Sequence, residues 1–515
     1  MYSKVLSGAA LGIDAIIVSV ETDISQGLPG LNLVGYLASS VKEAGDRVRA
    51  ALKNAGYFLP QQKITTNLSP ADIRKDGTNY DLAISVSILV SMGEFPISNE
   101  FKNELEETIF LGELALNGSI LPVSGVLPIV DYAARNGVKR VVLPEKNCGE
   151  ASFVSGVSII PVNHITDIID MLAYNTWAEE YEHTPEKEEC EFMGPDLGDV
   201  KGQETMKRGL VLAVAGFHNI IMTGAAGSGK SMIASCIPGI MPEMTYDEKM
   251  ELTKIYSVAE MTGGMDGLVD RRPFRAPGQS ITEIAMCGGG AVPKPGEVSL
   301  ANGGVLFLDE FPQYKKNVIE SLRQPMEDRK VSISRYRGVY TFPARFMLVS
   351  ARNNCPCGFY PDRNRCRCTA REICNYQNRI SHPVMDRIDI RLEVRPVSFD
   401  ELSGVHEGMD SHKAREIISL ARQRQESRYK NESFIFNSEI PQSRIEKYIV
   451  LSEECRDRIR EIYDKTKMSA RSYYRMLRLI RTIADIEDRE EIKASDVDEA
   501  VFFRNESEIK EGLLC

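Results

Sequence analysis

The stretch that decides the fold is HNIIMTGAAGSGKS, which runs from His218 to Ser231. Its first half is a short apolar run, typical of a buried parallel strand. Its second half begins at Gly224 and fits the spacing G-x-x-x-x-G-K-[ST] of a phosphate-binding loop. Glycines let backbone N–H groups turn inward around phosphates, and the helix that follows directs its positive end at the anion. The sequence therefore predicts an α/β domain with a nucleotide site.

The side chains of this loop have separate expected roles. Lys230 brings positive charge to the β- and γ-phosphates, and the Ser231 hydroxyl can bind Mg²⁺. ATP with Mg²⁺ is the expected ligand. The residues expected to contact it are those of the loop, namely Gly224, Ala225, Ala226, Gly227, Ser228, Gly229, Lys230 and Ser231.

A second apolar run, VLFLDE, covers residues Val305 to Glu310. Apolar residues followed by an acid are typical of a parallel strand whose C-terminal end opens on the ligand crevice. Asp309 is expected to hold Mg²⁺, directly or through water, and Glu310 to orient and polarise the attacking water. The alternative is a strand that ends in two surface carboxylates.

Two further stretches offer groups for phosphoryl transfer. RFMLVSA leads into Asn353, whose amide can hydrogen-bond the γ-phosphate or the lytic water. HPVMDRIDIRLEV contains Arg387, and an arginine supplied by a neighbouring subunit is worth roughly 10³–10⁵ in rate. The alternative for Arg387 is a salt bridge with Asp386 or Asp389.

The C-terminal part is predicted to be helical, over 412–429 and 472–487, because its apolar residues recur at helical spacing. Arg471 stands at the start of the second helix and could reach back to the nucleotide of its own chain. The competitors on the same helix are Arg475, Arg478 and Arg481, and most arginines on such a face are merely solvated.

Composition fits a globular protein: 43% of the 515 residues are apolar and 26% are charged. We find no run of about 18 apolar residues and no signal peptide, so neither a membrane partner nor export is expected. The 11 cysteines are then expected to be reduced or metal-bound in the cytoplasm.

Net charge is −11, yet residues 196–395 carry 27 Lys/Arg against 22 Asp/Glu. A polyanion would contact that segment.

Composition shifts divide the chain into domains. Residues 1–175 alternate short β-rich runs with helical stretches and form the first. Residues 176–195 include the acidic AEEYEHTPEKEECE and are predicted to be a solvated linker. Residues 196–396 are predicted to form the nucleotide-binding core, and residues 397–515 a helical domain.

Four cysteines occur as two C-x-C pairs, and they could close a tetrahedral zinc site. They are Cys355, Cys357, Cys366 and Cys368, with Cys374 as a spare. The alternative is four reduced thiols in a tight loop. The arginines between and beside them suit a surface that faces phosphate, and they are Arg363, Arg365 and Arg367.

The segment RKVSISRYRGVYTFPAR is predicted to be a β-hairpin with Arg335 and Arg337 near its tip. In a ring, such hairpins would line a pore with positive charge and bind backbone phosphates without reading sequence. The insert around Gly288 and Lys294 is a second expected pore loop. The alternative is a hairpin with solvated arginines.

Taken with these motifs, essentially the whole chain resembles the ComM/YifB family of bacterial Mg-chelatase-like AAA+ ATPases. The resemblance is carried by residues 26–57, 65–84, 111–129, 199–231, 272–282, 288–311, 321–328, 343–358 and 469–487. It implies a Lon-protease-like α+β N-terminal domain, an AAA+ αβα core and a C-terminal helical lid. It implies sensor roles for Asn353 and Arg471 and a trans arginine finger at Arg387. The family usually has His-His where this chain has Gly278-Gln279, and Met-Asn-Pro where it has Arg352-Asn353-Asn354.

The Lon-like resemblance does not extend to protease chemistry. The slot of the nucleophilic serine holds Asn79, and the run of the lysine partner holds Leu127, Pro128 and Ile129. A Ser–Lys dyad needs both groups, so we expect a non-proteolytic assembly domain.

The resemblance implies a hexameric ring that hydrolyses ATP and remodels single-stranded or branched DNA, by branch migration during natural transformation. Two alternatives stay open at this point. One is a chelatase-type motor that drives metal insertion by a partner subunit. The other is a nucleotide-gated DNA-binding scaffold with little turnover.

Overall fold

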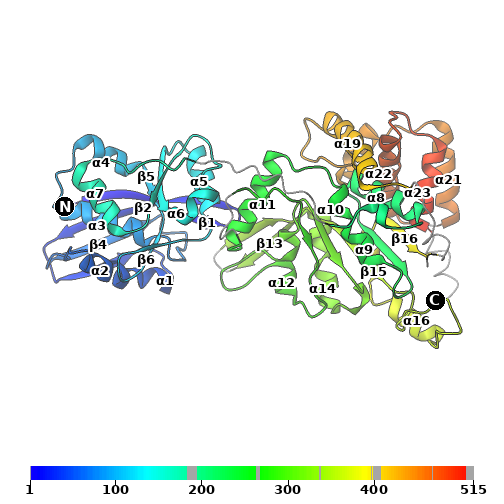
Figure 1. Ribbon diagram of the computed structural model, residues 1–515, viewed down its shortest axis with the longest axis horizontal. Coiled ribbons are helices and arrows are strands. Elements are labelled where there is room, and N and C mark those ends of the chain that lie inside the picture. Colours follow the sequence, from blue (N-terminus) through cyan, green and yellow to red (C-terminus); the bar gives the residue numbers. More distant parts are fainter. Residues whose placement is uncertain are drawn as a thin grey trace.

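The computed structural model describes residues 2–182, 194–261, 267–335, 338–395, 397, 408–466 and 468–505. Most of the predicted acidic linker lies outside these residues, as does Arg337. Figure 1 shows an elongated molecule with the N-terminal part at one end, the core predicted to bind nucleotide in the middle and the C-terminal helices beyond it. Among the described residues no helix is both long and apolar enough to span a bilayer.

The N-terminal part is a seven-stranded mixed sheet of order β3-β4-β2-β1-β5-β8-β9. Its strands are β1 (Tyr2–Leu11), β2 (Asp14–Ser25), β3 (Gly30–Val34), β4 (Lys63–Ser69), β5 (Thr108–Phe110), β8 (Arg140–Pro144) and β9 (Ser158–Val162). Its main helices are α2 (Ala44–Asn54), α3 (Asp81–Met92), α4 (Asn99–Glu106), α5 (Val126–Arg135), α6 (Glu145–Ala151) and α7 (Ile165–Tyr174). Helix α3 is almost wholly buried because most of its residues are apolar, and its Ser87 hydrogen-bonds Ser3 of β1 and Thr22 of β2.

The core is a parallel five-stranded sheet of order β11-β12-β15-β10-β16. These strands are β10 (Ile220–Gly224), β11 (Phe274–Arg275), β12 (Val305–Leu308), β15 (Met347–Arg352) and β16 (Ile390–Val394). The helices around them include α8 (Glu204–Gly216), α9 (Lys230–Ser235), α11 (Tyr246–Val258), α12 (Glu283–Cys287), α13 (Glu297–Leu300), α14 (Lys316–Ser321), α15 (Arg323–Asp328), α16 (Ala370–Gln377) and α17 (His382–Met385). The predicted strands in HNIIMTG, VLFLDE and RFMLVSA are confirmed as β10, β12 and β15.

The predicted hairpin is also confirmed. It consists of β13 (Lys330–Arg335) and β14 (Gly338–Pro343), which pair antiparallel with Arg335 opposite Gly338. The alternation of buried Val331 and Ile333 with polar residues fixes one face of the hairpin against the core.

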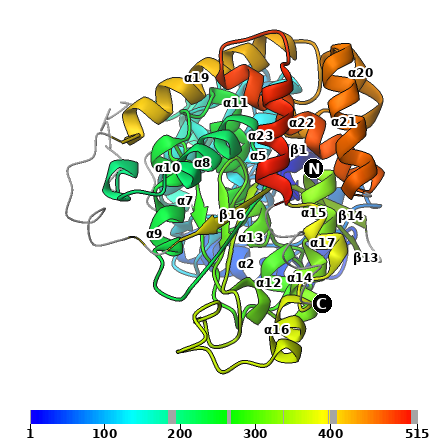
Figure 2. The same ribbon diagram turned by 90° about the vertical axis from the view of Figure 1, so that its right-hand side faces the viewer.

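The C-terminal helices share one continuous hydrophobic core with the parallel sheet. They are α19 (Ser411–Arg428), α20 (Ile445–Tyr448), α21 (Glu453–Thr466), α22 (Ala470–Ile486) and α23 (Ala494–Asn505). Helices α19 and α22 pack on α8, and α23 packs on β16. Figure 2 shows this layer on the side of the core away from α16.

The N-terminal part contacts the core through α5 and α11. Lys254 Nζ lies 2.6 Å from Asp131 Oδ2, and the Tyr246 hydroxyl donates to the Phe153 carbonyl at 2.7 Å. These bonds join segments that are far apart in the sequence.

Candidate functional site

The phosphate loop connects β10 to α9 at the carboxyl end of the parallel sheet. Gly227 and Gly229 have φ values of +76° and +86°, which L side chains rarely adopt. In the described part of the chain, the N–H groups of these two glycines donate no hydrogen bond. The loop therefore has backbone donors available for an anion, next to the start of a helix.

Lys230 is 7% exposed and its ammonium lies against the loop. It donates to the carbonyls of Gly224 and Ala225 at 3.1 and 2.8 Å, and to Asn353 Oδ1 at 3.2 Å. Burial lowers the pKa of Lys230, whereas the charges of Asp309 and Glu310 oppose that shift. A phosphate group would supply the counter-charge that this partly buried ammonium needs.

The serine of the loop and the acid after β12 lie together. Ser231 Oγ donates to Asp309 Oδ2 at 2.7 Å, although 78 positions separate them in the chain. A hydroxyl and a carboxylate oxygen at this distance are a donor set that fits Mg²⁺. Asp309 Oδ1 also accepts from the Glu310 N–H at 2.8 Å, which fixes the carboxylate.

Glu310 has a left-handed backbone, with φ at +48°, and its side chain is exposed. A non-glycine residue in this region stores strain, which is often found at functional positions. Its carboxylate accepts from Gln279 Nε2 at 2.7 Å. The sequence did not indicate this contact. In the sequence, Gln279 stands out only as a departure from the family pattern.

The neighbouring strand β15 brings Asn353 to the loop, as the Lys230 contact shows. The residues beside it have other partners. Arg352 Nε donates to Thr223 Oγ1 at 3.1 Å, and Asn354 Nδ2 donates to the Tyr360 carbonyl at 3.2 Å. Of the three residues in this run, Asn353 alone hydrogen-bonds Lys230.

Arg387 and Arg471 share one carboxylate. Both guanidinium groups pair with Glu327 on α15, Arg471 at 3.2 Å and Arg387 more closely. Arg387 is 6% exposed, whereas the Arg471 side chain is 47% exposed. The expected alternative partners of Arg387, Asp386 and Asp389, are therefore not its nearest acid. Nothing in the sequence singled out Glu327.

This arginine pair lies where the strands begin. The Arg387 carbonyl accepts from Asn219 Nδ2 at 3.0 Å, and Asn219 directly precedes β10. The phosphate loop follows the other end of β10, and five residues of strand span roughly 15 Å. Arg471 was expected to reach the nucleotide of its own chain. It lies instead toward the end of β10 opposite the phosphate loop, because the packing of the helical layer places the start of α22 there.

A buried ionic network supports the same region. Arg475, a competitor of Arg471, donates to Asp389 Oδ1 at 2.7 Å, and His218 Nδ1 lies 3.5 Å from the same carboxylate. Burial alone would raise the pKa of Asp389, but the charges of Arg475 and His218 hold it well below its usual range. These contacts link the start of β16 to α22.

The predicted pore loops lie side by side. Arg335 is exposed and its Nε lies 3.4 Å from the Gly290 carbonyl of the insert. Lys294 of the same insert pairs with Glu260 at 2.9 Å. Both basic residues line a cavity of about 350 Å³, and Asn79 and Ile129 line it as well. Two of the positions that correspond to the Ser–Lys dyad region of the Lon proteases, Asn79 and Ile129, thus line the same cavity as Arg335 of the hairpin.

Asn79 is buried and its amide donates to the Gly8 carbonyl at 2.6 Å. It therefore serves the packing of the N-terminal sheet.

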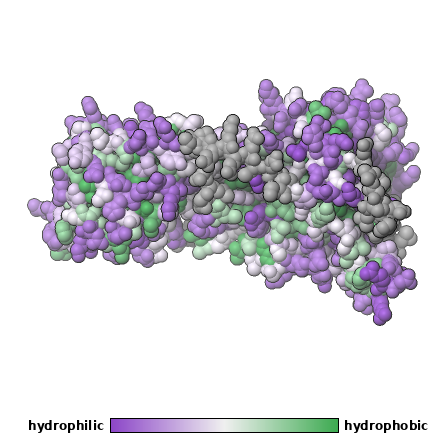
Figure 3. Space-filling model, in the orientation of Figure 1, coloured by the Kyte–Doolittle hydropathy of each residue, from purple (hydrophilic) through white to green (hydrophobic). Residues whose placement is uncertain are grey.

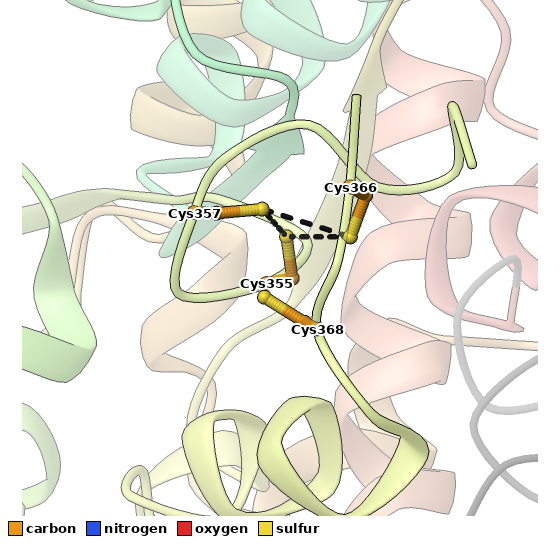
Figure 4. Close-up of side chains that lie close together, drawn as sticks. All are labelled: Cys355, Cys357, Cys366 and Cys368. Atoms are coloured by element: carbon orange, nitrogen blue, oxygen red, sulfur yellow. Dashed lines mark hydrogen bonds between the residues drawn. The ribbon is translucent and has the colours of Figure 1, made fainter. Parts of the chain in front are cut away.

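The four predicted cysteines converge, and Figure 4 shows their side chains pointing toward one another. Their sulfur atoms all lie within 4.8 Å of one another. The separations are 3.3 Å for Cys355–Cys357, 3.7 Å for Cys355–Cys366 and 3.6 Å for Cys357–Cys366. The group could hold a metal ion, and Cys374 on α16 is not part of it.

One of these thiols is set apart electrostatically. The Phe359 N–H and the Cys355 thiol lower the pKa of Cys357 to about 6. A thiolate is the form of cysteine that binds metal ions.

The arginines of the cysteine loop are exposed. Figure 3 shows hydrophilic residues at the tip of the molecule where α16 lies in Figure 1. The Arg363 guanidinium lies 4.8 Å from the centre of the Tyr360 ring, and that of Arg365 lies 4.1 Å from the Phe359 ring. Stacking on a ring face leaves the edge of a guanidinium able to donate hydrogen bonds, and one nitrogen of Arg363 donates to the Cys368 carbonyl at 3.1 Å. Arg367 is exposed as well.

Comparison with known proteins adds the family. Models of magnesium chelatase match three segments: subunit ChlI over residues 196–402, subunit ChlI of Mg-chelatase over 20–147, and the subunit ChlI C-terminal region over 408–504. The protein YifB of Salmonella typhimurium is 37% identical over 503 residues, covering 96% of each chain. The competence protein ComM of Haemophilus influenzae is 36% identical, covering 97% of each chain.

A shorter likeness links the chain to proteases. The archaeal Lon protease of Methanocaldococcus jannaschii is 26% identical over 177 residues, which is 33% of this chain and 26% of that protein. With the parallel sheet and the helical layer, these matches confirm the predicted fold class. At this identity and coverage, the chain belongs to the ComM/YifB family of magnesium-chelatase-like AAA+ ATPases.

Proposed function

We propose that the protein is a Mg²⁺-dependent ATPase motor that assembles as a ring, a hexamer, and remodels single-stranded or branched DNA. The observation that carries the ATPase part is the 2.7 Å contact between Ser231 and Asp309, beside the partly buried ammonium of Lys230. Two oxygen ligands and one cation thus lie beside the glycine loop. Mg²⁺, when bound, would neutralise charge on the phosphate oxygens.

The residues of the site divide the work of hydrolysis. Lys230 holds the phosphates and Asn353, its hydrogen-bond partner, is the sensor of the terminal phosphate. Glu310 orients the attacking water and takes its proton. Gln279 positions the Glu310 carboxylate through its 2.7 Å hydrogen bond. Because Gln279 precedes the insert that contacts Arg335, this bond offers a route from the pore loops to the catalytic carboxylate.

Arg387 and Arg471 act together on the nucleotide of the neighbouring subunit in this proposal. Their shared pairing with Glu327 supports a joint role, since one carboxylate holds both groups in one place. The position of the pair where the strands begin favours a site other than the phosphate loop of the same chain. The sequence assigned the trans role to Arg387 alone.

DNA is the proposed polyanion. The exposed Arg335 and the arginines of the cysteine loop, Arg363, Arg365 and Arg367, supply positive charge without base-reading geometry. Arg337, which the sequence also assigns to this surface, lies outside the described residues. Competence is what the name of the Haemophilus relative records, and a role in DNA uptake and recombination follows for this chain as a proposal.

The cysteine cluster is proposed to hold Zn²⁺. Four thiolates around Zn²⁺ at about 2.3 Å place the sulfurs about 3.8 Å apart. The three separations among Cys355, Cys357 and Cys366, 3.3 to 3.7 Å, are close to that value, and Cys368 Sγ lies within 4.8 Å of each of them. A disulfide would need about 2.05 Å.

One experiment separates this proposal from its main alternative. The names of the matching models favour a chelatase-type motor, which would be stimulated by a metal-inserting partner. We expect DNA to stimulate ATP turnover and Arg335→Ala to reduce that stimulation more than the basal rate. Lys53→Ala, an exposed lysine on α2, is the matched control and should leave stimulation unchanged. Turnover indifferent to every DNA form would contradict the DNA role.

A further inference from the structure

The phosphate loop is held from outside by the cysteine loop. The Ala226 N–H donates to the Gly358 carbonyl at 3.0 Å, and Gly358 directly follows Cys357 in the chain. Gly358 has φ at +80°, and a Cβ at this position would lie 2.8 Å from the Ala226 Cβ. Only glycine therefore permits this approach without strain. The contact joins two segments more than a hundred positions apart.

The cysteine loop has little else to fix its shape. Residues 355–368 contain no helix or strand. Their buried cluster is small and consists of Cys355, Cys366 and Ile373, with three partly buried residues around it. A few turns provide local bonds, such as Cys366 N–H to the Asp362 carbonyl at 2.8 Å. Ordering such a loop costs a large amount of conformational entropy, and a cross-link between its two sides would reduce that cost.

A metal ion at the four sulfurs would be that cross-link. It would join the pair that contains Cys357 to the pair that contains Cys366, and so close the loop on both sides of Gly358. Structural zinc sites contribute directly to folding in this way.

We propose that a Zn²⁺ ion held by Cys355, Cys357, Cys366 and Cys368 latches the phosphate loop in its binding conformation through Gly358. By ordering the cysteine loop, the ion would keep the Gly358 carbonyl in place. That carbonyl accepts the hydrogen bond from the Ala226 N–H on the outer side of the phosphate loop. The N–H groups of Gly227 and Gly229 then remain directed at the ligand. This inference rests on the proposed function, because it assumes that nucleotide binds the loop.

Two variants separate the metal from the latch. Cys366→Ser removes a ligand, and Gly358→Ala leaves all four ligands but breaks the contact with Ala226. Gly156→Ala is the matched control, because Gly156 also has a positive φ, +85°, but has nothing within 4 Å of the added Cβ. The measurements are zinc content per chain and the Kd of a fluorescent ADP analogue for the full-length protein.

We expect about one zinc per wild-type chain and about fivefold weaker nucleotide binding in both test variants, the effect of one lost hydrogen bond. Cys366→Ser should lack zinc, whereas Gly358→Ala should keep it. Gly156→Ala should match wild type in both measurements. Removal of zinc from the wild type by a strong chelator should weaken binding equally, and added Zn²⁺ should restore it, which keeps the test decisive if Cys366→Ser does not fold.

Wild-type Kd in Gly358→Ala, or tight nucleotide binding by wild-type protein without zinc, would overturn the latch. Zinc bound by a wild-type protein that takes up no nucleotide would instead overturn the proposed ATPase function and the latch that rests on it, while the metal site would stand.

Discussion

Replacing Ser231 and Asp309, singly and together, tests whether they share one Mg²⁺. Their side chains are 2.7 Å apart, and the acceptor is a carboxylate. Hydrogen bonds to charged groups are worth about 1.5–3 kcal/mol, which corresponds to a change of roughly 10- to 150-fold. We expect Ser231→Ala and Asp309→Asn each to raise the Mg²⁺ concentration for half-maximal turnover by that range.

The double variant decides the interpretation. If both side chains act through one ion, the second substitution adds little, and the coupling free energy is about 1.5–3 kcal/mol. The assay is a Mg²⁺ titration of ATP turnover. Ser235→Ala is the control, because Ser235 lies one turn along α9 and its hydroxyl donates to the Ser231 carbonyl at 2.9 Å. Fully additive effects of the two substitutions would refute a shared ion.

Three further predictions follow from the same geometry. Glu310→Gln should keep nucleotide affinity and lose turnover by roughly 10²–10⁴-fold, as for a lost general base; unchanged turnover would favour a static scaffold. Arg387→Ala and Arg471→Ala should each be nearly inactive alone. Mixing either variant with Lys230→Ala subunits should restore turnover, because an interface then forms between one subunit with an intact phosphate loop and a neighbour with intact arginines. No recovery would place the arginines in the site of their own chain. Asp389→Asn should lower the unfolding free energy by about 3 kcal/mol, since it breaks a buried ion pair. Because the folded-state pKa of Asp389 is lowered, the stabilisation by this carboxylate is present above pH about 4 and is lost progressively below it. Urea titrations should therefore show the difference in unfolding free energy between wild type and Asp389→Asn narrow as the pH falls below about 4. An equal difference in unfolding free energy at all pH values would contradict this.

The local parts of the site were predictable because each motif includes its own strand. The runs that end at Gly224 and Leu308 are short and apolar and are followed by Ala225 and Asp309, residue types that are depleted in strands, so β10 and β12 were expected. Parallel strands end at one edge of the sheet, which brings Ser231 to Asp309. The hairpin followed in the same way from alternation and a glycine at its turn.

The partners of these residues were not predictable, because they come from distant segments. Gln279 reaches Glu310 across 31 positions, and Glu327 reaches Arg471 across 144. The helix that starts at Ala470 was expected from its periodicity, but periodicity cannot say which end of the sheet receives it. Packing of the helical layer against α8 decides that question. The Gly358 contact likewise depends on tertiary structure alone.

The most direct test of the central claim is the steady-state rate of ATP hydrolysis by full-length protein, with Mg²⁺, measured without DNA and with single-stranded, duplex and branched DNA. A ring motor predicts turnover that depends on Lys230 and rises with DNA. Absence of turnover under all of these conditions, or a rate that survives Lys230→Ala, would contradict it.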